Sequence, residues 1–483
     1  RAGHQIDLSP RLVEILAYLA DRPGEIVSKD ELLDRFWGDV HVTENTLTRA
    51  VADIRKALGD HPDPPQFIQT VSRRGYRFIA PVEPMSDPAR LATKSSGGSD
   101  SGERRREPVR STDLYLDWAR GRAVLESLDA SGLTDALRSF ERVVEGTPGS
   151  AAAHVGLANA CFLQFERSRV GNVLAHPFLE RAIEHARRAV QLDAAMAEAW
   201  ATLGFVLTAS GQVDESRAAA AHAVAIEPAN WRHHYRLAVA TWGEERLRAV
   251  DRTLSLLPRF PAALFLSAMV HVARRALGHA RDVAERGATV QAQQAGAGGL
   301  TLPAAGLHWM CGLIALAEGD AAEAAAAFGR EIADARPAHV YGCEFLINAI
   351  IAQGFLHLEQ RSFDRARDRF LSTLEWIPGH ARARVGLVLI ERLKQQKEAS
   401  IEIADVHEEL TRGGKHTEAA LLVAAAEAWT GSTSAACAHL ATLIDRAPPG
   451  PTGWNVGVDP MFRPLSGTAS FEALLARIAG RAA

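Results

Sequence analysis

Polar and cationic side chains are concentrated in two short stretches near the start of the chain, and their chemistry suits contact with a nucleic acid. Residues 43–58 read TENTLTRAVADIRKAL, and residues 70–78 read TVSRRGYRF. Arginine and lysine bind phosphates, and asparagine, threonine and arginine can also form hydrogen bonds with base edges. Residues 49–77 carry six Lys or Arg and three Asp or Glu, a net charge of +3, whereas the whole chain has a net charge of −4. Any nucleic-acid site is therefore a local patch.

Sequence patterns that would indicate catalysis or a metal site are incomplete. Residues 413–415, Gly-Gly-Lys, lack the rest of a phosphate-binding loop, and His407-Glu408 would need a second histidine at position 411, which is threonine. No Gly-x-Ser-x-Gly sequence occurs. The four cysteines are far apart, which predicts small buried residues in a reducing cytosol. We therefore expect no enzymatic activity, no cofactor and no metal.

Composition divides the chain into three parts. Its 483 residues exceed the usual size of one domain. Residues 83–112 are rich in Ser, Gly, Pro and charge, which predicts a flexible linker between domains at 1–82 and 113–483. No apolar run reaches the roughly 18 residues of a membrane span, so we expect a cytoplasmic protein without membrane contact. The chain starts without methionine and without a signal-peptide pattern.

The first 82 residues carry signals for three helices followed by a β-hairpin. A Ser-Pro pair at residues 9–10 begins the first helix, and Ser28 forms a capping box with Glu31 at the start of the second. The third helix, residues 43–58, has apolar residues at helical spacing on one side and polar or basic residues on the other. The runs FIQTV and YRFIA, separated by SRRG, predict two short strands and a tight turn.

This order of elements is typical of a winged helix-turn-helix. The major groove of B-DNA admits one helix, and cations on a hairpin tip reach neighbouring phosphates or the minor groove. Taken alone, each arginine could equally belong to an ordinary solvated face. Their joint placement on the helix and the hairpin favours binding of double-stranded DNA. Trp37 and Tyr76 are expected to be packing aromatics rather than base-stacking ones.

The stretches PGEIVSKDEL, LTRAVADIRKALGD and GYRF resemble the effector domain of OmpR/PhoB response regulators, and more closely the CadC and HilA class. The resemblance covers about 75 residues and implies that the third helix enters the major groove, with the hairpin as the wing. Only GHQIDL could remain of the N-terminal sheet found in this family, so we expect that sheet to be truncated. The family's tandem half-sites suggest a dimer on DNA by analogy. The implied DNA-binding positions are Thr43, Asn45, Thr46, Thr48, Arg49, Ala52, Arg55 and Lys56 on the helix, and Thr70, Arg73, Arg74 and Tyr76 in the hairpin.

The remainder of the chain resembles a tetratricopeptide array. In a 34-residue frame from Ala197, small and bulky residues fall at the positions that pack two helices together, and Pro228 ends the unit. Three other segments fit the same frame in part, through Ala136, Phe140, Val143 and Pro148; Gly312, Gly319, Ala324 and Phe328; and Gly354, Ala366, Phe370 and Pro378. We expect about eight units, with an insertion within residues 154–193 and a loop at 291–306. An extended DPMFRPL segment and a helix over Phe471–Ile478 would cap the array.

The expected fold is mainly α, with a winged helix-turn-helix followed by an α-solenoid of helical hairpins. The leading hypothesis is a bacterial, sequence-specific DNA-binding transcriptional regulator whose repeats bind a small effector, or a protein or peptide partner in their groove. The alternative is a scaffold or adaptor in which the winged helix contacts proteins. A third possibility, a regulatory fragment of a cyclase or kinase, depends only on the tail segment.

Overall fold

The computed structural model describes residues 10–20, 22, 24–37, 44–61, 65–71, 74–80, 111–296, 305–394 and 403–483. The chain divides into two compact units, Arg1–Ala123 and Val124–Ala483, and helix α4 (Ser111–Ser127) runs across their boundary. The predicted starts at Ser9 and Thr43, and the linker up to residue 110, lie outside the described residues.

The first unit contains a three-helix core and a small sheet. Its elements are α1 (Pro10–Ala20), β1 (Ile26–Ser28), α2 (Lys29–Trp37), α3 (Glu44–Leu58), β2 (Ile68–Val71) and β3 (Gly75–Phe78). The backbone N–H of Glu31 donates to Ser28 Oγ at 3.1 Å, as expected for the N-terminus of α2. Fully buried Ile15, Leu32 and Ile54 bring one apolar side of each helix into a common core.

The sheet has the order β1-β3-β2, and both pairings are antiparallel. The β2–β3 hairpin confirms the prediction from the sequence. Strand β1 was not predicted, because its three residues, Ile-Val-Ser, are too short for an alternating pattern. Val27 of β1 and Thr70 of β2 flank Tyr76 of β3, whose ring reaches the core.

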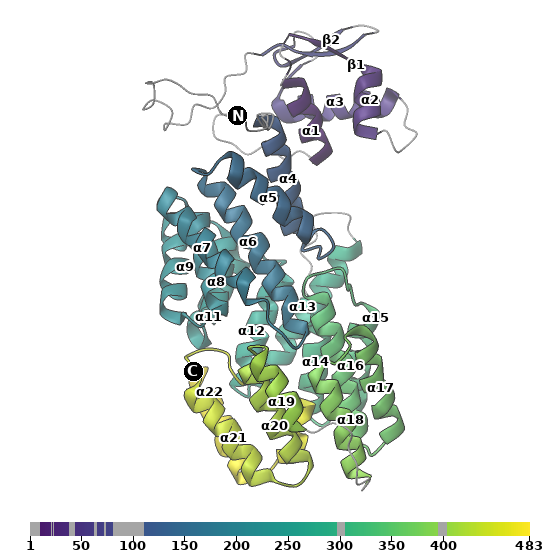
Figure 1. Ribbon diagram of the computed structural model, residues 1–483, viewed down its shortest axis with the longest axis vertical. Coiled ribbons are helices and arrows are strands. Elements are labelled where there is room, and N and C mark those ends of the chain that lie inside the picture. Colours follow the sequence, from purple (N-terminus) through teal and green to yellow (C-terminus); the bar gives the residue numbers. More distant parts are fainter. Residues whose placement is uncertain are drawn as a thin grey trace, which may run out of the picture. The chain divides into compact units, whose positions relative to one another are not determined.

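The second unit is a solenoid of helical hairpins (Figure 1). In the described residues the sixteen helices α6 to α21 pair successively into eight hairpins, in agreement with the expected number of units. Helix α5 precedes them and α22 follows. Their bounds are α5 (Leu133–Gly146), α6 (Ala151–Arg167), α7 (His176–Leu192), α8 (Ala197–Ala209), α9 (Val213–Ile226), α10 (Trp231–Ala240), α11 (Gly243–Leu256), α12 (Pro261–Ala273), α13 (Leu277–Gly296), α14 (Leu307–Ala317), α15 (Ala321–Ala333), α16 (Gly342–Glu359), α17 (Phe363–Trp376), α18 (Ala381–Leu393), α19 (Ile403–Arg412), α20 (His416–Trp429), α21 (Thr433–Arg446) and α22 (Ala469–Arg481).

Small residues opposite aromatic rings set the spacing of these helices. Phe370 of α17 is fully buried between Gly354 of α16 and Gly386 of α18. A Cβ atom at either glycine would lie within 2.5 Å of the ring. Gly312 faces Phe328 in the same way. The close approach predicted from the repeat pattern is therefore confirmed, and it requires glycine because no side chain fits beneath the rings.

Two parts of the solenoid differ from the prediction. Residues 291–296 of the expected loop form the last turns of α13, and residues 297–304 lie outside the described part of the chain. The segment expected to be extended is instead a 3-10 helix, η3 (Pro460–Leu465). Asp459 caps its N-terminus, because its carboxylate accepts from the Met461 N–H at 3.0 Å. Proline at its first position and this cap favour a helical turn over an extended chain.

The solenoid also closes on itself. A short 3-10 helix, η2 (Ser168–Val170), and the loop after it lie between α6 and α7 and contact helices more than 200 residues further along the chain. The Asn172 side chain donates to Gly379 O at 2.7 Å and to Glu409 Oε1 at 2.9 Å, and its Oδ1 accepts from the Ala381 N–H at 3.1 Å. The first hairpin therefore packs directly on the last ones.

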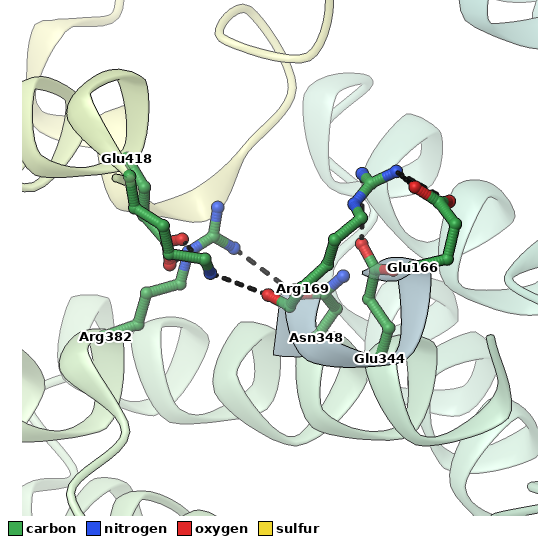
Figure 2. A network of polar contacts seen from close by, with 7 residues as sticks. Glu166, Arg169, Glu344, Asn348, Arg382 and Glu418 are labelled. Atoms are coloured by element: carbon green, nitrogen blue, oxygen red, sulfur yellow. Dashed lines mark hydrogen bonds and ion pairs between the residues drawn. The ribbon is translucent and has the colours of Figure 1, made fainter. Parts of the chain in front are cut away.

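A network of charged side chains accompanies this closure (Figure 2). Arg169 lies 3.1 Å from Glu166 and 3.6 Å from Glu344. Lys415 donates to the Arg169 carbonyl at 2.6 Å and pairs with Glu418, which lies 3.7 Å from Arg382. The network is a contiguous polar link between hairpins distant in sequence.

None of the helices in the described ranges combines the length and the apolar character needed to cross a bilayer.

Candidate nucleic-acid interface

Helix α3 separates its residues sharply into a buried and an exposed side. Leu47, Val51 and Ile54 have no exposed surface and fix the helix on the core. The side chains of Thr48, Arg49, Ala52, Asp53 and Lys56 are exposed on the opposite side, and Thr46 is half-buried. Since the core determines the rotation of the helix, its polar side must face outwards, as the prediction for a groove-reading helix requires.

The hairpin beside α3 turns tightly and presents Arg74. The Arg74 N–H donates to Val71 O at 3.0 Å, which closes the turn, and the Arg74 side chain is exposed. Gly75 follows at φ +149°. A Cβ atom at this position would lie 1.9 Å from the carbonyl oxygen of Val27 in β1. Glycine is thus required because two strands approach closely, a reason that the sequence alone did not reveal.

Arg55 fastens the hairpin to the helix. Its Nη2 donates to Ile68 O and to Thr70 Oγ1, both at 2.8 Å. Arg55 and Thr70 were both predicted to face DNA. The structure gives Arg55 a positioning role as well, because its guanidinium holds β2 against α3. An arginine on the side of a helix that adjoins a hairpin carries no separate sequence signal for this role.

Asp60 is a positioning residue that the sequence analysis did not single out. It is 7% exposed, and its carboxylate accepts from the Gln66 N–H at 2.6 Å and the Ile68 N–H at 2.9 Å. Burial raises the pKa of this carboxyl, but hydrogen bonds from the backbone N–H groups outweigh it and hold the pKa below its ordinary value of 3.8. Asp60 thereby orients the start of β2, and its place directly after the Gly that ends α3 is the signal that could have identified it.

We expect Asp60→Asn to destabilise the region between α3 and β2 by about 1–2 kcal/mol at pH 7, because an amide cannot accept as a carboxylate does. The native pKa is lowered, so the stabilisation by Asp60 is present above pH 3.8 and is lost as the pH falls through the native value. Hydrogen exchange of residues 65–71 in both proteins, over a pH series from 7 to below 3.8, measures the difference. Asp53→Asn, the same change on the exposed side of α3, is the control; an equal effect there, or a gap between the two proteins that does not narrow as the pH falls below 3.8, contradicts the assignment.

The remaining predicted site residues are placed differently. Tyr76 is 3% exposed and belongs to the core, which confirms its prediction as a packing aromatic, and its contact with DNA stays a prediction. Asn45 lies in α3, but its side chain is not described. Thr43 and Arg73 lie outside the described residues, and the side chain of Trp37 does so too. Thr48, Arg49, Ala52 and Lys56 thus share the exposed side of α3, Arg55 joins this helix to Thr70 of β2, and Arg74 is exposed at the end of the hairpin.

Two cysteine thiols of the second unit have low reactivity because they are buried. Burial raises the pKa of Cys161 to about 11 and that of Cys311 to about 12, so both thiols are poor nucleophiles at neutral pH. In the ranges that the structure describes, no three His, Cys, Asp or Glu side chains come together as a metal site would require.

The first unit is a winged helix-turn-helix DNA-binding domain of the OmpR/PhoB type. Residues 3–78 match the family described as "Transcriptional regulatory protein, C terminal". Among curated proteins, the transcriptional activator CadC of Escherichia coli is 41% identical over 83 residues, which are 17% of this chain and 16% of CadC. The cholera toxin transcriptional activator of Vibrio cholerae is 38% identical over 88 residues, 18% of this chain and 29% of that protein. The similarity covers less than a third of either relative.

Solved structures similar to this chain are helical-repeat proteins. The human IFIT1 dimer with m7Gppp-AAAA is similar over 69% of this chain and 72% of that chain, with 14% identity and a TM-score of 0.47. A tetratricopeptide repeat protein from Parabacteroides merdae is similar over 58% of this chain and 99% of its own, with 12% identity and a TM-score of 0.40. The second unit itself is an α-solenoid by the successive pairing of its helices into hairpins.

Proposed function

We propose that this protein is a sequence-specific, DNA-binding transcriptional regulator without enzymatic activity, in which the helical repeats receive the regulatory signal. The observation that carries the proposal is the exposed side of α3, where Arg49 and Lys56 stand beside a hairpin that presents Arg74. A helix with this side in the major groove reads base edges, while the hairpin arginine binds a phosphate. The curated relatives that match this unit are named as transcriptional activators and regulators, which supports the same role.

The second part of the proposal is that the repeats bind a protein, peptide or small effector, and that the protein acts on DNA as a dimer. Solenoids offer extended binding surfaces, which supports a partner. The chain itself covers part of the solenoid, because η3 packs on α16 and α20 and Trp429 donates to Met461 O at 2.9 Å. A peptide partner of the repeats would therefore bind away from these helices or displace the tail.

Arg74→Ala is expected to weaken binding to every DNA sequence several-fold and to reduce the salt dependence, the slope of log K against log salt concentration, by about one.

Arg49→Ala should instead change which sequences are preferred, because base contacts carry the specificity. Fluorescence anisotropy on genomic DNA fragments between about 50 and 200 mM salt measures both. The matched control is Arg248→Ala, which removes one exposed arginine from α11 in the second unit.

Binding that does not depend on salt, or an Arg248 variant that behaves like the Arg74 variant, would contradict the interface. A chain that retains no DNA but captures proteins after nuclease treatment would favour the adaptor role for the winged helix.

A further inference from the structure

The closure of the solenoid leaves a cavity between segments that are far apart in sequence. The turn between α4 and α5 pairs with the turn between α15 and α16: the Ala130 N–H donates to Ala338 O at 2.6 Å, and the Val340 N–H donates to Leu128 O at 2.9 Å. We call this junction, residues 128–131 against 337–340, the seam.

A cavity of about 380 Å³ lies at the seam. It is bounded by residues 130–131 and 337–340 of the seam, by Arg167 and Val170 from the end of α6 and from η2, and by Cys343 in the first turn of α16. Pockets of 300–1,000 Å³ that are mostly apolar with a few polar groups are typical small-molecule sites. The lining fits that description, since Ala130, Val170 and Val340 supply apolar surface and only a few side chains supply polar atoms.

His339 in this lining has a hydrogen-bond donor without a partner. The ring is 8% exposed, and its Nδ1 accepts from the Tyr341 N–H at 3.2 Å, so the proton of the neutral ring is on Nε2. Burial lowers the pKa of His339 to about 4, which keeps the ring neutral at physiological pH. Nε2 has no partner in the part of the chain that the structure describes, and leaving a buried donor unpaired costs about 1–3 kcal/mol. The atom itself has almost no accessible surface, so a ligand in the cavity reaches it through a small turn of the His339 ring.

The surroundings of His339 favour an acceptor with negative charge. Arg167 lines the cavity, and its Nη1 makes only a long 3.4 Å bond to Ala130 O. Arg336 lies close enough to influence the His339 ring. Cys343 stands in the first turn of α16, where the helix dipole is positive. The nearby acid, Asp129, is already engaged by the N–H and hydroxyl of Ser131 at 2.9 and 2.8 Å.

We propose that the seam cavity is a binding site for a small carboxylate with an apolar body, whose oxygens accept from His339 Nε2 and Arg167. The site would supply the small-effector input of the proposed function, and only its regulatory meaning rests on that function. A ligand here contacts both sides of the seam at once. Binding therefore stabilises the closed solenoid by as much as the ligand's affinity for the closed state exceeds its affinity for an open one.

Cys343 allows the site to be tested in the full-length chain. Iodoacetamide alkylates this half-buried thiol in the cavity wall, and peptide mass spectrometry gives its rate relative to that of a free cysteine-containing peptide added to the same samples as reference. The probes are butyrate, 4-methylpentanoate, benzoate and phenylacetate, each paired with its neutral amide. We expect at least one acid to slow alkylation of Cys343 by threefold or more with a Kd of about 1 mM or below, while alkylation of the added peptide is unaffected and the amide protects at least fivefold less well.

His339→Leu should abolish the protection, and His339→Gln, which retains an N–H donor, should preserve most of it. The proposal is overturned if no acid protects Cys343 at about ten times that Kd, if acid and amide protect equally, or if the His339→Leu chain is still protected. The acid–amide comparison uses the unaltered chain, so it decides even where a variant folds poorly. Anisotropy with DNA on the same samples separates failure of this site from failure of the DNA-binding role.

Discussion

Replacement of Gly75 by alanine is expected to remove DNA binding by disrupting the sheet of the winged helix. The added Cβ would lie 1.9 Å from Val27 O and 2.8 Å from Val27 C, which are backbone atoms and cannot turn aside as a side chain could. Strand β3 would have to separate from β1, where Ser28 pairs with Gly75 and Val27 with Tyr76. We expect a loss of about 3 kcal/mol or more in the stability of this unit, the size associated with strain at a special backbone conformation.

Hydrogen exchange of residues 24–28 and 74–78, together with anisotropy on DNA, measures the effect. Gly24→Ala is the control in the same unit: Gly24 has φ +85°, but a Cβ there meets no atom within 4 Å. That variant should cost only about 1 kcal/mol, the penalty for a left-handed alanine. If the two variants are equally stable, the close approach of β1 and β3 is not what requires glycine at position 75.

Local signals in the sequence were sufficient for most of the helices. The Ser28 cap, the apolar spacing of α3 and the glycine–aromatic pairs of the repeats each act within a few turns or one hairpin. Such features predict an element because the residues that stabilise it are neighbours in the chain. The hairpin β2–β3 belongs to the same group, since its strands are joined by a tight turn.

Features that depend on distant partners could not be predicted in this way. Strand β1 exists because β3 pairs with it, and Arg55 acquires its positioning role only when β2 lies against α3. The closure through Asn172 joins residues more than 200 positions apart, and no periodic pattern in the sequence predicts such a contact. The exposed side of α3 was predictable from amphipathicity, whereas the cavity at the seam was not, because three separate segments form it.

The second large effect concerns Arg246, a charged residue in the interior of the solenoid. It is 3% exposed and stacks on Trp242 at 4.6 Å from the ring centroid. Its Nε donates to Ala238 O at 2.8 Å and to Thr241 O at 2.9 Å, and its Nη2 donates to Val239 O at 3.2 Å. These carbonyls belong to the C-terminal end of α10, which has ten residues and leaves such groups without partners inside the helix. Burial lowers the pKa of Arg246 to about 9, so it still carries its charge at neutral pH.

Arg246→Met should therefore destabilise the α10–α11 hairpin by about 3 kcal/mol, because three buried carbonyls lose their donor while the methionine keeps most of the apolar contact. The stability of the Arg246→Lys chain should lie between those of the original chain and the Arg246→Met chain, since one ammonium cannot match the planar fork of a guanidinium. Hydrogen exchange of residues 231–256 gives the local free energy of opening. The control, Arg248→Ala, removes an exposed arginine from the same helix and should change it by no more than about 0.5 kcal/mol. An Arg246→Met chain as stable as the original would mean that burying the charge costs as much as its three hydrogen bonds contribute, and the helix end would then need another explanation.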